Sequence, residues 1–328
     1  MSHDRRTWLL IAGLLLAVTV LFGLSLMSGR VWAPWSAWVD RSDPRWAIIF
    51  ELRLPRTVLA VAIGAALGMS GAAMQGYTRN PLADPGVLGV SSMAALGAVM
   101  SLYLGLAFTA TWLLPACAVL GAAAGVVLML VLAGTTGGAV TFLLAGVILN
   151  TVASAGVALA LSLAPNPWAA QEIISWLLGS LADRSVDEVR LAAPLIVAGL
   201  AVLLTLPRSL DALTLGETGA AALGVNLSAV RVLLAVGVGV ASGASVAVTG
   251  LIGFVGLIAP HLVRPLVGHR PGALLIPSAL AGSALVLAAD IVVRLTPSAA
   301  EMRLGVATAA VGGPFFLALL ITMRRRLA

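Results

Sequence analysis

Long apolar stretches alternate with short polar connections along almost the whole chain. A helix needs about 20 mostly apolar residues to cross the hydrocarbon core of a bilayer. The stretches that meet this length most clearly are residues 57–75, 88–108, 112–133, 142–163, 191–207, 274–293 and 305–323. A further stretch, residues 9–27, is longer than the core of a typical signal peptide, so we expect it to be retained as the first span. The pattern predicts an all-α, polytopic membrane protein.

The stretch between Arg231 and Arg264 carries no charge and is too long for a single span. Three glycines and a proline interrupt it, at Gly250, Gly253, Gly256 and Pro260. We expect two shortened helices that are separated at the glycines, with a kink at the proline. Both ends of the chain are basic, which predicts cytoplasmic termini and therefore an even number of spans, the residues being Arg5, Arg6, Arg324, Arg325 and Arg326. The sequence thus predicts about ten transmembrane helices in a single domain, residues 1–328.

Residues 28–56 differ from the apolar stretches because they are rich in arginine and tryptophan. The tryptophans of this region are Trp32, Trp35, Trp38 and Trp46. Tryptophan at this density is typical of segments at the boundary between membrane and water. We therefore expect the region to lie along the membrane interface.

Composition excludes a soluble globular protein, since 60% of the 328 residues are hydrophobic, 10% are charged and the mean hydropathy is +1.08. The single cysteine, Cys117, has no partner for a disulfide or a thiolate metal site. All 19 basic residues are arginines. A phosphate-binding loop for ATP requires a lysine, so ATP can drive this protein only through a separate subunit. Runs of small residues at 64–73 and 121–125 predict closely packed helices.

Catalytic and ion-coupled functions have few candidate residues. Gly68-Met69-Ser70-Gly71 matches a motif of intramembrane serine proteases, with His261 as the potential base, but Ser70 lies in a run of small packing residues, which favours a structural role. The pattern predicts no catalytic residues and no metal site. Asp290 is the only ionisable residue in the clear spans and lies near one end, which disfavours an ion-coupled secondary transporter. A structural or signalling role stays open.

The region 208–231 is a polar, helix-forming segment among the spans. Its core, residues 211–226, is predicted to form two short helical turns. The apolar positions are Leu213, Leu215 and Leu223, and the small ones are Gly216, Ala220, Ala221 and Gly224. Small residues allow the backbone of a partner to approach closely, so this is a candidate docking surface. An ordinary long loop is the alternative, and composition does not decide between the two.

Several motifs occur in a characteristic order from residue 51 to the C-terminus. They include Glu51-Leu-Arg-Leu-Pro-Arg56, Gly64-Ala-Ala-Leu-Gly-Met-Ser-Gly71, Arg79-Asn-Pro-Leu-Ala-Asp-Pro85, Leu215-Gly-Glu217, Gly253-Phe-Val-Gly-Leu-Ile-Ala-Pro-His-Leu-Val-Arg264 and Gly313-Pro-Phe-Phe316. In this, the chain closely resembles the FecCD family, the permease subunits of binding-protein-dependent ABC importers for iron-siderophores, haem and vitamin B12.

The resemblance implies a permease of the type II ABC importers, located in the bacterial inner membrane and working as a homodimer with the translocation path at the dimer interface. Two copies of a cytoplasmic ATPase subunit, which bind the ATP and Mg, dock on one side, and a periplasmic substrate-binding protein docks on the other. No cofactor belongs to this chain, and no nucleic acid is a partner. Residues 208–231 become a cytoplasmic coupling segment.

The resemblance also assigns roles to single residues. The contacts with the ATPase fall on Leu215, Gly216, Glu217, Ala220, Ala221, Leu223 and Gly224. A cytoplasmic gate is formed by Asn80, Pro81 and Leu82, and residues 144–158 line the path. Arg53, Arg56 and Arg294 match positions that meet glutamates of the binding protein. One departure is the pair Met302-Arg303, where the family usually has Leu-Pro.

Charge geometry supports the docking assignment. Arg53 and Arg56 are three residues apart beside Pro55, so both guanidinium groups are expected to project from one surface into the aqueous phase. Anchoring to lipid headgroups is the alternative for such arginines. The chain has only 3 histidines and 2 tyrosines, so metal coordination is expected to belong to the binding protein. Arg303 near the entrance suits an anionic cargo, either haem or a siderophore, rather than vitamin B12. Haem is favoured narrowly over a ferric siderophore, with vitamin B12 as the alternative.

Overall fold

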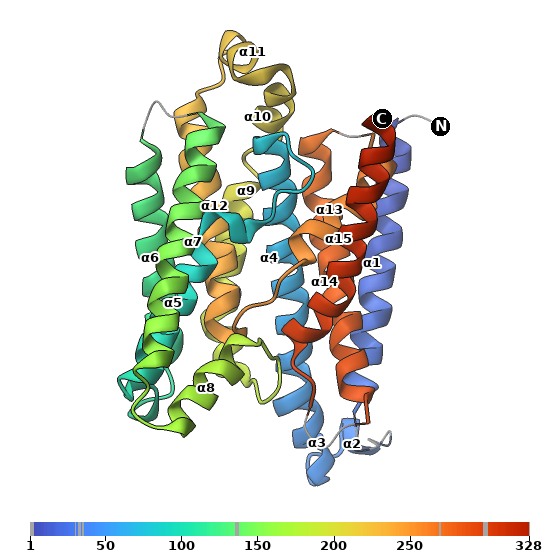
Figure 1. Ribbon diagram of the computed structural model, residues 1–328. Helices are drawn as coiled ribbons and strands as arrows, with labels where there is room; N and C mark the ends of the chain where they lie inside the picture. The colour runs from blue at the N-terminus through green and yellow to red at the C-terminus, as the bar shows by residue number, and fades with distance from the viewer. Residues whose placement is uncertain are drawn as a thin grey trace.

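The structure is a computed structural model that describes residues 3–29, 31, 34, 36–134, 138–268, 270–297 and 301–327, with side chains described between residues 6 and 322. The described residues form helices and connecting turns without a strand, and the long helices run side by side in one bundle (Figure 1). Those that make up the bundle are α1 His3–Met27, α4 Leu54–Thr78, α5 Val90–Tyr103, α6 Leu113–Ala133, α7 Ala139–Ser162, α9 Val186–Leu203, α12 Leu227–Thr249, α13 Val255–Val263, α14 Pro271–Leu295 and α15 Leu304–Leu327.

Within the described residues, seven helices are long and apolar enough to cross a membrane. An eighth span results if α9 is counted together with the short helices that follow it across a bend of 46°. The helices α5 and α13 are apolar but shorter. The all-α membrane fold is therefore confirmed, whereas the number of ten spans stays a prediction, because it requires both short helices to count as spans.

The predicted interfacial region is shorter than expected. Only α2, Ser36–Val39, precedes a continuous helical stretch that starts at Pro44 with α3, Pro44–Ala47, and passes through the π-helical turn Ile48–Arg53 into α4. The carboxylate of Asp43 starts this stretch by accepting a hydrogen bond from the N–H of Arg45. Trp46 stacks on Phe50, with ring centroids 4.8 Å apart, while Trp32 and Trp35 lie outside the described residues.

The charge-free stretch breaks where the glycines predict. Residues 250–254 separate α12 from α13, and Gly250 adopts a φ of 72° that favours glycine. Two parts of the prediction were wrong: α12 is a full span of 23 residues, and Gly256 lies inside α13. α12 keeps its full length up to the break, so only α13 is a shortened helix. Pro260 lies inside α13.

The connection after α8 forms backbone hydrogen bonds with the C-terminus of α12, beside this break, and with the first turn of α15. The N–H of Ser180 donates to the carbonyl of Thr249 at 2.8 Å, and the N–H of Gly305 donates to the carbonyl of Gly179 at 3.3 Å. A membrane interior offers no water for unpaired backbone groups, so irregular segments there must satisfy one another. The break, the end of the loop after α8 and the start of α15 are joined in this way.

Helix α4 lies at the centre of the bundle and packs closely against α14 and α13. A Cβ atom added to Gly68 would lie 2.1 Å from the carbonyl oxygen of Ser278, and one added to Gly71 would lie 1.8 Å from that of Gly256. Gly64 meets Gly282 in the same manner. The close packing predicted from the small residues is confirmed, because these backbones touch where no side chain intervenes.

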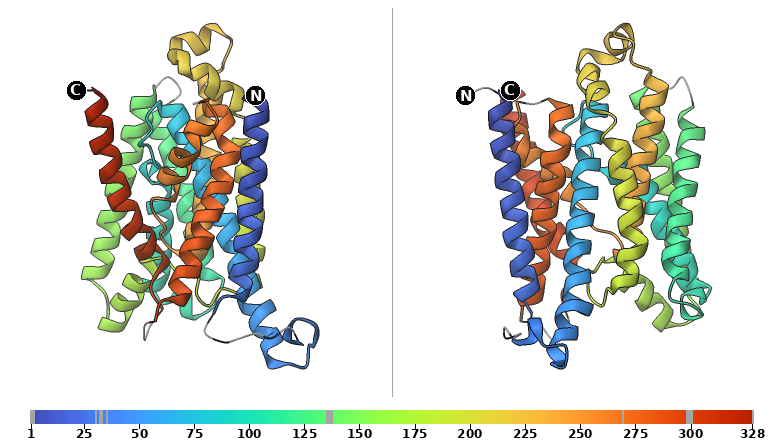
Figure 2. Two further views of the ribbon diagram at one scale, coloured as in Figure 1. Left: turned by 90° about the vertical axis from the view of Figure 1, so that its right-hand side faces the viewer. Right: turned by 180° about the vertical axis from the view of Figure 1, so that it is seen from behind.

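The two ends of the bundle differ. α1 begins and α15 ends at the same end, where the short helices between α9 and α12 project (Figures 1 and 2). The opposite end carries α2, α3 and α8, Pro167–Leu177. The arrangement agrees with an even number of spans. The side chains of Arg5 and of residues 324–326, on which the predicted orientation depends, lie outside the described residues.

Candidate functional site

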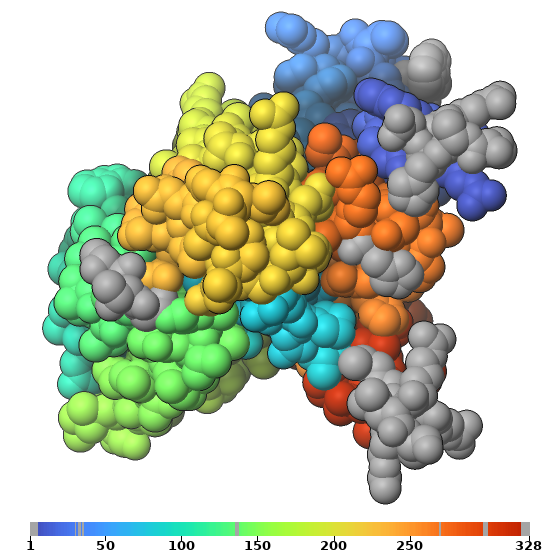
Figure 3. All heavy atoms as spheres, turned by 90° about the horizontal axis from the view of Figure 1, so that it is seen from above, coloured from blue at the N-terminus to red at the C-terminus, as the bar shows by residue number. Residues whose placement is uncertain are grey.

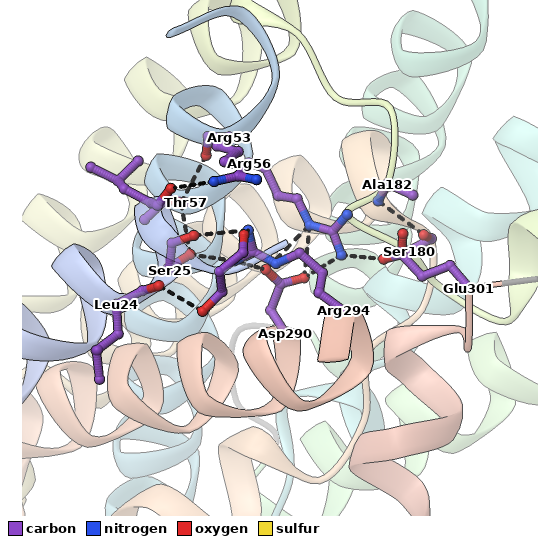
Figure 4. Close-up of polar contacts among 12 residues, drawn as sticks. Leu24, Ser25, Arg53, Arg56, Thr57, Ser180, Ala182, Asp290, Arg294 and Glu301 are labelled. Carbon is purple, nitrogen blue, oxygen red and sulfur yellow. Dashed lines mark hydrogen bonds and ion pairs between the residues drawn. The ribbon is translucent and has the colours of Figure 1, made fainter. Parts of the chain in front are cut away.

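At the end of the bundle that carries α2 and α3, a charged cluster joins three helices (Figure 4). Asp290 of α14 is completely buried between Arg56 of α4 and Arg294 of its own helix. Arg56 donates to Asp290 Oδ1 from Nε at 2.9 Å and from Nη2 at 2.7 Å, and Arg294 Nη2 lies 2.8 Å from Asp290 Oδ2. Arg56 also forms a short contact with Glu301. One buried carboxylate thus compensates two guanidinium groups.

The cluster also fixes the end of α1. Arg53 donates to the carbonyl of Leu26 at 3.0 Å and to that of Val31 at 2.6 Å. Arg294 donates to the carbonyl of Ser25 at 2.9 Å. Both arginines therefore satisfy carbonyl groups at the C-terminus of α1 that have no partner within the helix.

The expectation that the guanidinium groups of Arg53 and Arg56 project into the aqueous phase was wrong. Arg53, Arg56 and Arg294 are only 6%, 8% and 8% exposed. Their guanidinium groups turn inward because a buried carboxylate and unpaired helix-end carbonyls bind them through charge-assisted hydrogen bonds. Their role in docking a partner stays a prediction.

A cavity of about 200 Å³ opens beside this cluster. Its charged lining residues are Arg53, Arg56, Asp183, Arg184 and Arg294. Burial lowers the pKa of the Arg184 guanidinium, with Glu188 at 3.8 Å as its nearest ion-pair partner, and its Nε has no hydrogen-bond partner among the described residues. The arginines thus concentrate positive charge in this cavity, beside the cluster that joins three helices.

The predicted coupling segment lies at the opposite end of the bundle. It forms α10, Pro207–Ala212, a 3-10 turn, Leu213–Leu215, and α11, Gly216–Ala222. Short helical elements are present as expected, but they run from residue 207 to 222 rather than within the predicted core 211–226. We call this projecting part the α10–α11 segment; it stands out from the bundle in Figure 1. Residues 227–231, which the prediction included, instead form the first turn of α12.

The residues of this segment do not all face outward. Leu215 and Leu223 are 67% and 65% exposed, and Ala221 and Gly224 are exposed beside them. Ala220 is completely buried, so its placement on the contact surface was wrong: it packs beneath the segment against the chain's own core.

Two further residues of the segment have other orientations. Glu217 turns toward the bundle, where its Oε1 accepts a hydrogen bond from the N–H of Ala139 at 2.8 Å. Gly216 is half-buried and has a φ of 88°, a value that favours glycine between two short helices.

The predicted gate residues form the turn that follows α4. Asn80 is exposed, Pro81 and Leu82 are half-buried, and Asn80 Oδ1 accepts a hydrogen bond from the N–H of Leu82 at 3.0 Å. The turn lies beside the α10–α11 segment when the molecule is viewed from that end (Figure 3). Its role as a gate stays a prediction.

A cavity of about 350 Å³ lies between α4, α12 and the segment that precedes α5. Its polar lining side chains are Asp84, Ser91, Ser92, Asn150, Ser245 and Thr249, and no described lining residue is cationic. Asn150 belongs to α7, the helix predicted to line the path. The apolar side chains of α7 are largely exposed, as Leu144 and Val152 are at 57% and 58%.

The protease hypothesis finds no support in the geometry. Ser70 is completely buried, and neither its Oγ nor Nδ1 of His261 has a hydrogen-bond partner among the described residues. The His261 ring instead contacts Phe315 edge to face, with centroids 5.6 Å apart. In the part of the chain that the structure describes, no three His, Cys, Asp or Glu side chains converge as metal ligands would.

Sequence reasoning missed the partners of the key charges. Glu301 was not recognised as a partner of Arg56, and Arg231 was taken only as the end of the polar segment. Arg231 in fact is 4% exposed and donates to the hydroxyl of Tyr77 at 3.2 Å and to the carbonyl of Gly134 at 3.0 Å. Only the four-residue spacing of Asp290 and Arg294 on one helix gave a local signal.

Comparisons with known proteins agree with this architecture. The model of the FecCD transport family matches residues 15–322. The vitamin B12 import system permease protein BtuC of Klebsiella pneumoniae is 37% identical over 322 residues, covering 98% of this chain and 95% of that protein. The uncharacterized ABC transporter permease protein YvrB of Bacillus subtilis is 36% identical over 327 residues, covering 94% of this chain and 92% of that protein.

Among solved structures, a metal-chelate type ABC transporter in an inward-facing conformation matches with a TM-score of 0.86 and 32% identity, over 95% of this chain and 98% of that one. The chain belongs to the FecCD transport family and is a permease of the ABC importer type.

Proposed function

We propose that two copies of this chain form the membrane channel of an importer that moves a bulky metal chelate into the cytoplasm. Two ATPase subunits dock on the α10–α11 segments, and a substrate-binding protein docks at the opposite end. The observation that carries this proposal is the pair Leu215 and Leu223, which are 67% and 65% exposed on a segment that projects from the bundle. Exposed leucines at such a tip favour burial against a partner.

The arginine-lined cavity supports docking of an acidic partner at the other end. Arg56 and Arg294 pair with the carboxylates of Asp290 and Glu301, whereas Arg53 binds only backbone carbonyls and Arg184 lines the same cavity. Arginine binds carboxylates through paired hydrogen bonds. The binding protein therefore presents carboxylates to this cavity, and both ends of the chain lie on the ATPase side of a bacterial cytoplasmic membrane.

For the cargo, we favour a chelate of the vitamin B12 type. Relatives with 37% identity are named vitamin B12 permeases. The cavity of about 350 Å³ also has no cationic side chain in its described lining, so it offers no counter-charge to the propionates of haem. This proposal places vitamin B12 before haem, the reverse of the order expected from the sequence, which relied on Arg303.

Haem is the second candidate because of a smaller cavity of about 170 Å³ that Arg184 and Arg303 line together with Glu172. Two guanidinium groups at this position suit an anionic chelate.

Reconstitution of the complex in liposomes tests the proposal. The permease, its ATPase subunit and its binding protein are combined, and ATP hydrolysis and uptake are measured with cobalamin, haem and a ferric siderophore in turn. We expect cobalamin to give the largest stimulation of both. Stimulation by haem alone contradicts the cargo assignment, and uptake by the permease alone under an ion gradient contradicts the importer mechanism.

A further inference from the structure

Two carboxylates of the α10–α11 segment reach out to spanning helices that are distant in sequence. Asp211 Oδ1 accepts a hydrogen bond from the N–H of Gly272, in the first turn of α14, at 2.8 Å. Glu217 Oε1 accepts one from the N–H of Ala139, the first residue of α7, also at 2.8 Å. These contacts bridge 61 and 78 positions along the chain.

Among the described residues, no local side chain caps either helix. Gly138, before α7, has no side chain, and the side chain of Arg270, before α14, makes no cap hydrogen bond. By contrast, α12 begins at the local cap Asn226, whose Oδ1 accepts from the N–H of Ala229 at 3.0 Å. The first N–H groups of a helix need outside acceptors, and a carboxylate is the most favourable one because of the helix dipole. In α7 and α14, the α10–α11 segment provides it.

Glycines allow the segment to approach both helices closely. A Cβ atom on Gly138 would lie 3.2 Å from Glu217 Oε2, and one on Gly272 would lie 2.6 Å from the carbonyl oxygen of Pro207. The segment therefore contacts the backbone of both helix ends directly. A small displacement of the segment would compress or break these contacts.

The two helices belong to different parts of the bundle. α14 packs along α4 in the core, whereas α7 packs on α5 and α6 and exposes an apolar face. Seen from the end, the α10–α11 segment lies between the green helices around α7 and the orange helices around α14 (Figure 3). A rigid displacement of the segment thus acts on both parts at once.

We propose that Asp211 and Glu217 are positioning residues that transmit movement of the α10–α11 segment to the N-termini of α14 and α7. The proposal rests on the proposed function, in which an ATPase moves this segment. Glu217, which the sequence assigned to the contact surface, acts on the inner side of the segment. The contact with the ATPase itself falls to the exposed leucines.

Separate removal of the two carboxylates tests the link. Glu217→Ala and Asp211→Ala delete the acceptors, whereas Glu217→Gln and Asp211→Asn keep a side-chain oxygen in place. Asn166→Ala removes an ordinary local cap, from the N–H of Ala169 at the far end of the bundle, and is the matched control. Copurification with the ATPase, ATP hydrolysis and cargo uptake are measured for each variant.

Spin labels report the movement of each helix. In a Cys117→Ser background, a nitroxide is attached at Val140→Cys on α7 or at Ile276→Cys on α14, both exposed positions in the first two turns. A single label per chain gives one distance across the dimer, which is measured with and without ATP.

We expect all variants to copurify with the ATPase, and the alanine variants to lose about five- to tenfold in uptake per ATP, the factor that corresponds to one lost helix cap. Glu217→Ala abolishes the ATP-dependent shift at Val140 but not at Ile276, and Asp211→Ala does the reverse. The Gln and Asn variants restore most of the shift, and Asn166→Ala behaves as wild type.

Unchanged uptake per ATP in both alanine variants, or an equal loss in Asn166→Ala, overturns the proposal. A shift that persists at Val140 in Glu217→Ala does the same. Failure of the wild-type chain to copurify with any ATPase is a different result: it overturns the proposed function, and with it the role of the link in transport.

Discussion

Single charges at the end of the bundle that carries α2 and α3 join three helices. Asp290 is completely buried, and among the described residues it is the carboxylate that both Arg56 and Arg294 contact. A buried ion pair contributes little compared with an apolar replacement, but removal of one partner leaves the other charge uncompensated. Loss of the Asp290 charge is therefore expected to weaken the contacts that Arg56 and Arg294 make between α1, α4 and α14.

Asp290→Asn removes the charge and keeps the shape. We expect it to lower the free energy of unfolding by about 3–5 kcal/mol, because two buried guanidinium groups lose their common counter-ion. Thermal unfolding of the purified permease in detergent measures the effect. Asp187→Asn, at a carboxylate that is 86% exposed, is the control and is expected to change stability by less than about 0.5 kcal/mol. Equal melting temperatures of the two variants contradict the prediction.

The sequence could predict the charges of this cluster but not their pairing. Arg53, Arg56 and Arg294 were recognised as a group from the sequence. The prediction that Arg53 and Arg56 project into water was wrong, since it followed the general preference of arginine side chains for water. The partner of Arg56 lies 234 positions away, on a helix whose rotation the sequence does not determine. The spans, in contrast, follow from the length of apolar stretches alone.

At the scale of elements, α4 and α14 pack through direct contact of their backbones rather than through large side chains. α4 and α14 approach through Gly64, Gly68 and Gly282, and here the pattern of small residues was sufficient to predict the packing. Which helices meet was not predictable, since small residues occur on several of them.

Gly68→Leu tests this contact. Its Cβ would lie 2.1 Å from the carbonyl oxygen of Ser278, so the helices must separate, and we expect a loss of about 1–3 kcal/mol or more in stability. Gly13→Leu in α1, where nothing lies within 4 Å of an added Cβ, is the control. Differential scanning of intrinsic fluorescence compares the two, and a control as unstable as Gly68→Leu would argue against the contact.

The tip of the α10–α11 segment gives a second prediction at this scale. Leu223→Glu places a charge on a 65% exposed apolar position and is expected to weaken binding of the ATPase subunit by about tenfold, since a desolvated leucine contact is lost. Binding of the ATPase subunit is measured on permease that is held in nanodiscs and immobilised on a surface. Leu104→Glu, at a 59% exposed position in the turn after α5, should bind as wild type. Unaltered binding of Leu223→Glu removes this leucine from the interface.

The two ends of the molecule present surfaces that suit partners of different character. One end carries exposed leucines on a projecting segment, and the other carries a cavity of about 200 Å³ lined by arginines. Binding at the apolar end should change little with salt, whereas binding at the charged end should weaken as ionic strength screens it.

Arg184→Gln probes the charged end, because this residue lines the cavity without belonging to the buried cluster around Asp290. We expect slower association with the binding protein, by about threefold to tenfold, and a weaker dependence on salt, since one steering charge is lost. Stopped-flow association at several salt concentrations measures both. Arg190→Gln, whose side chain is 76% exposed, serves as the control. The same salt dependence in Arg184→Gln and wild type would exclude Arg184 from docking.

The hydrogen bonds among the interior connections bear on how the protein is made. Ser180 binds the carbonyl of Thr249, and the carbonyl of Gly179 is bound by Gly305, at the start of the last helix. A ribosome delivers these groups in chain order, so the carbonyl of Gly179 stays without this partner until α15 has been synthesised. A chain that stops before α15 lacks the donor for the carbonyl of Gly179, although the bond between Ser180 and Thr249 can already form. Completion of the last helix is then the step at which a nascent permease becomes resistant to membrane proteases.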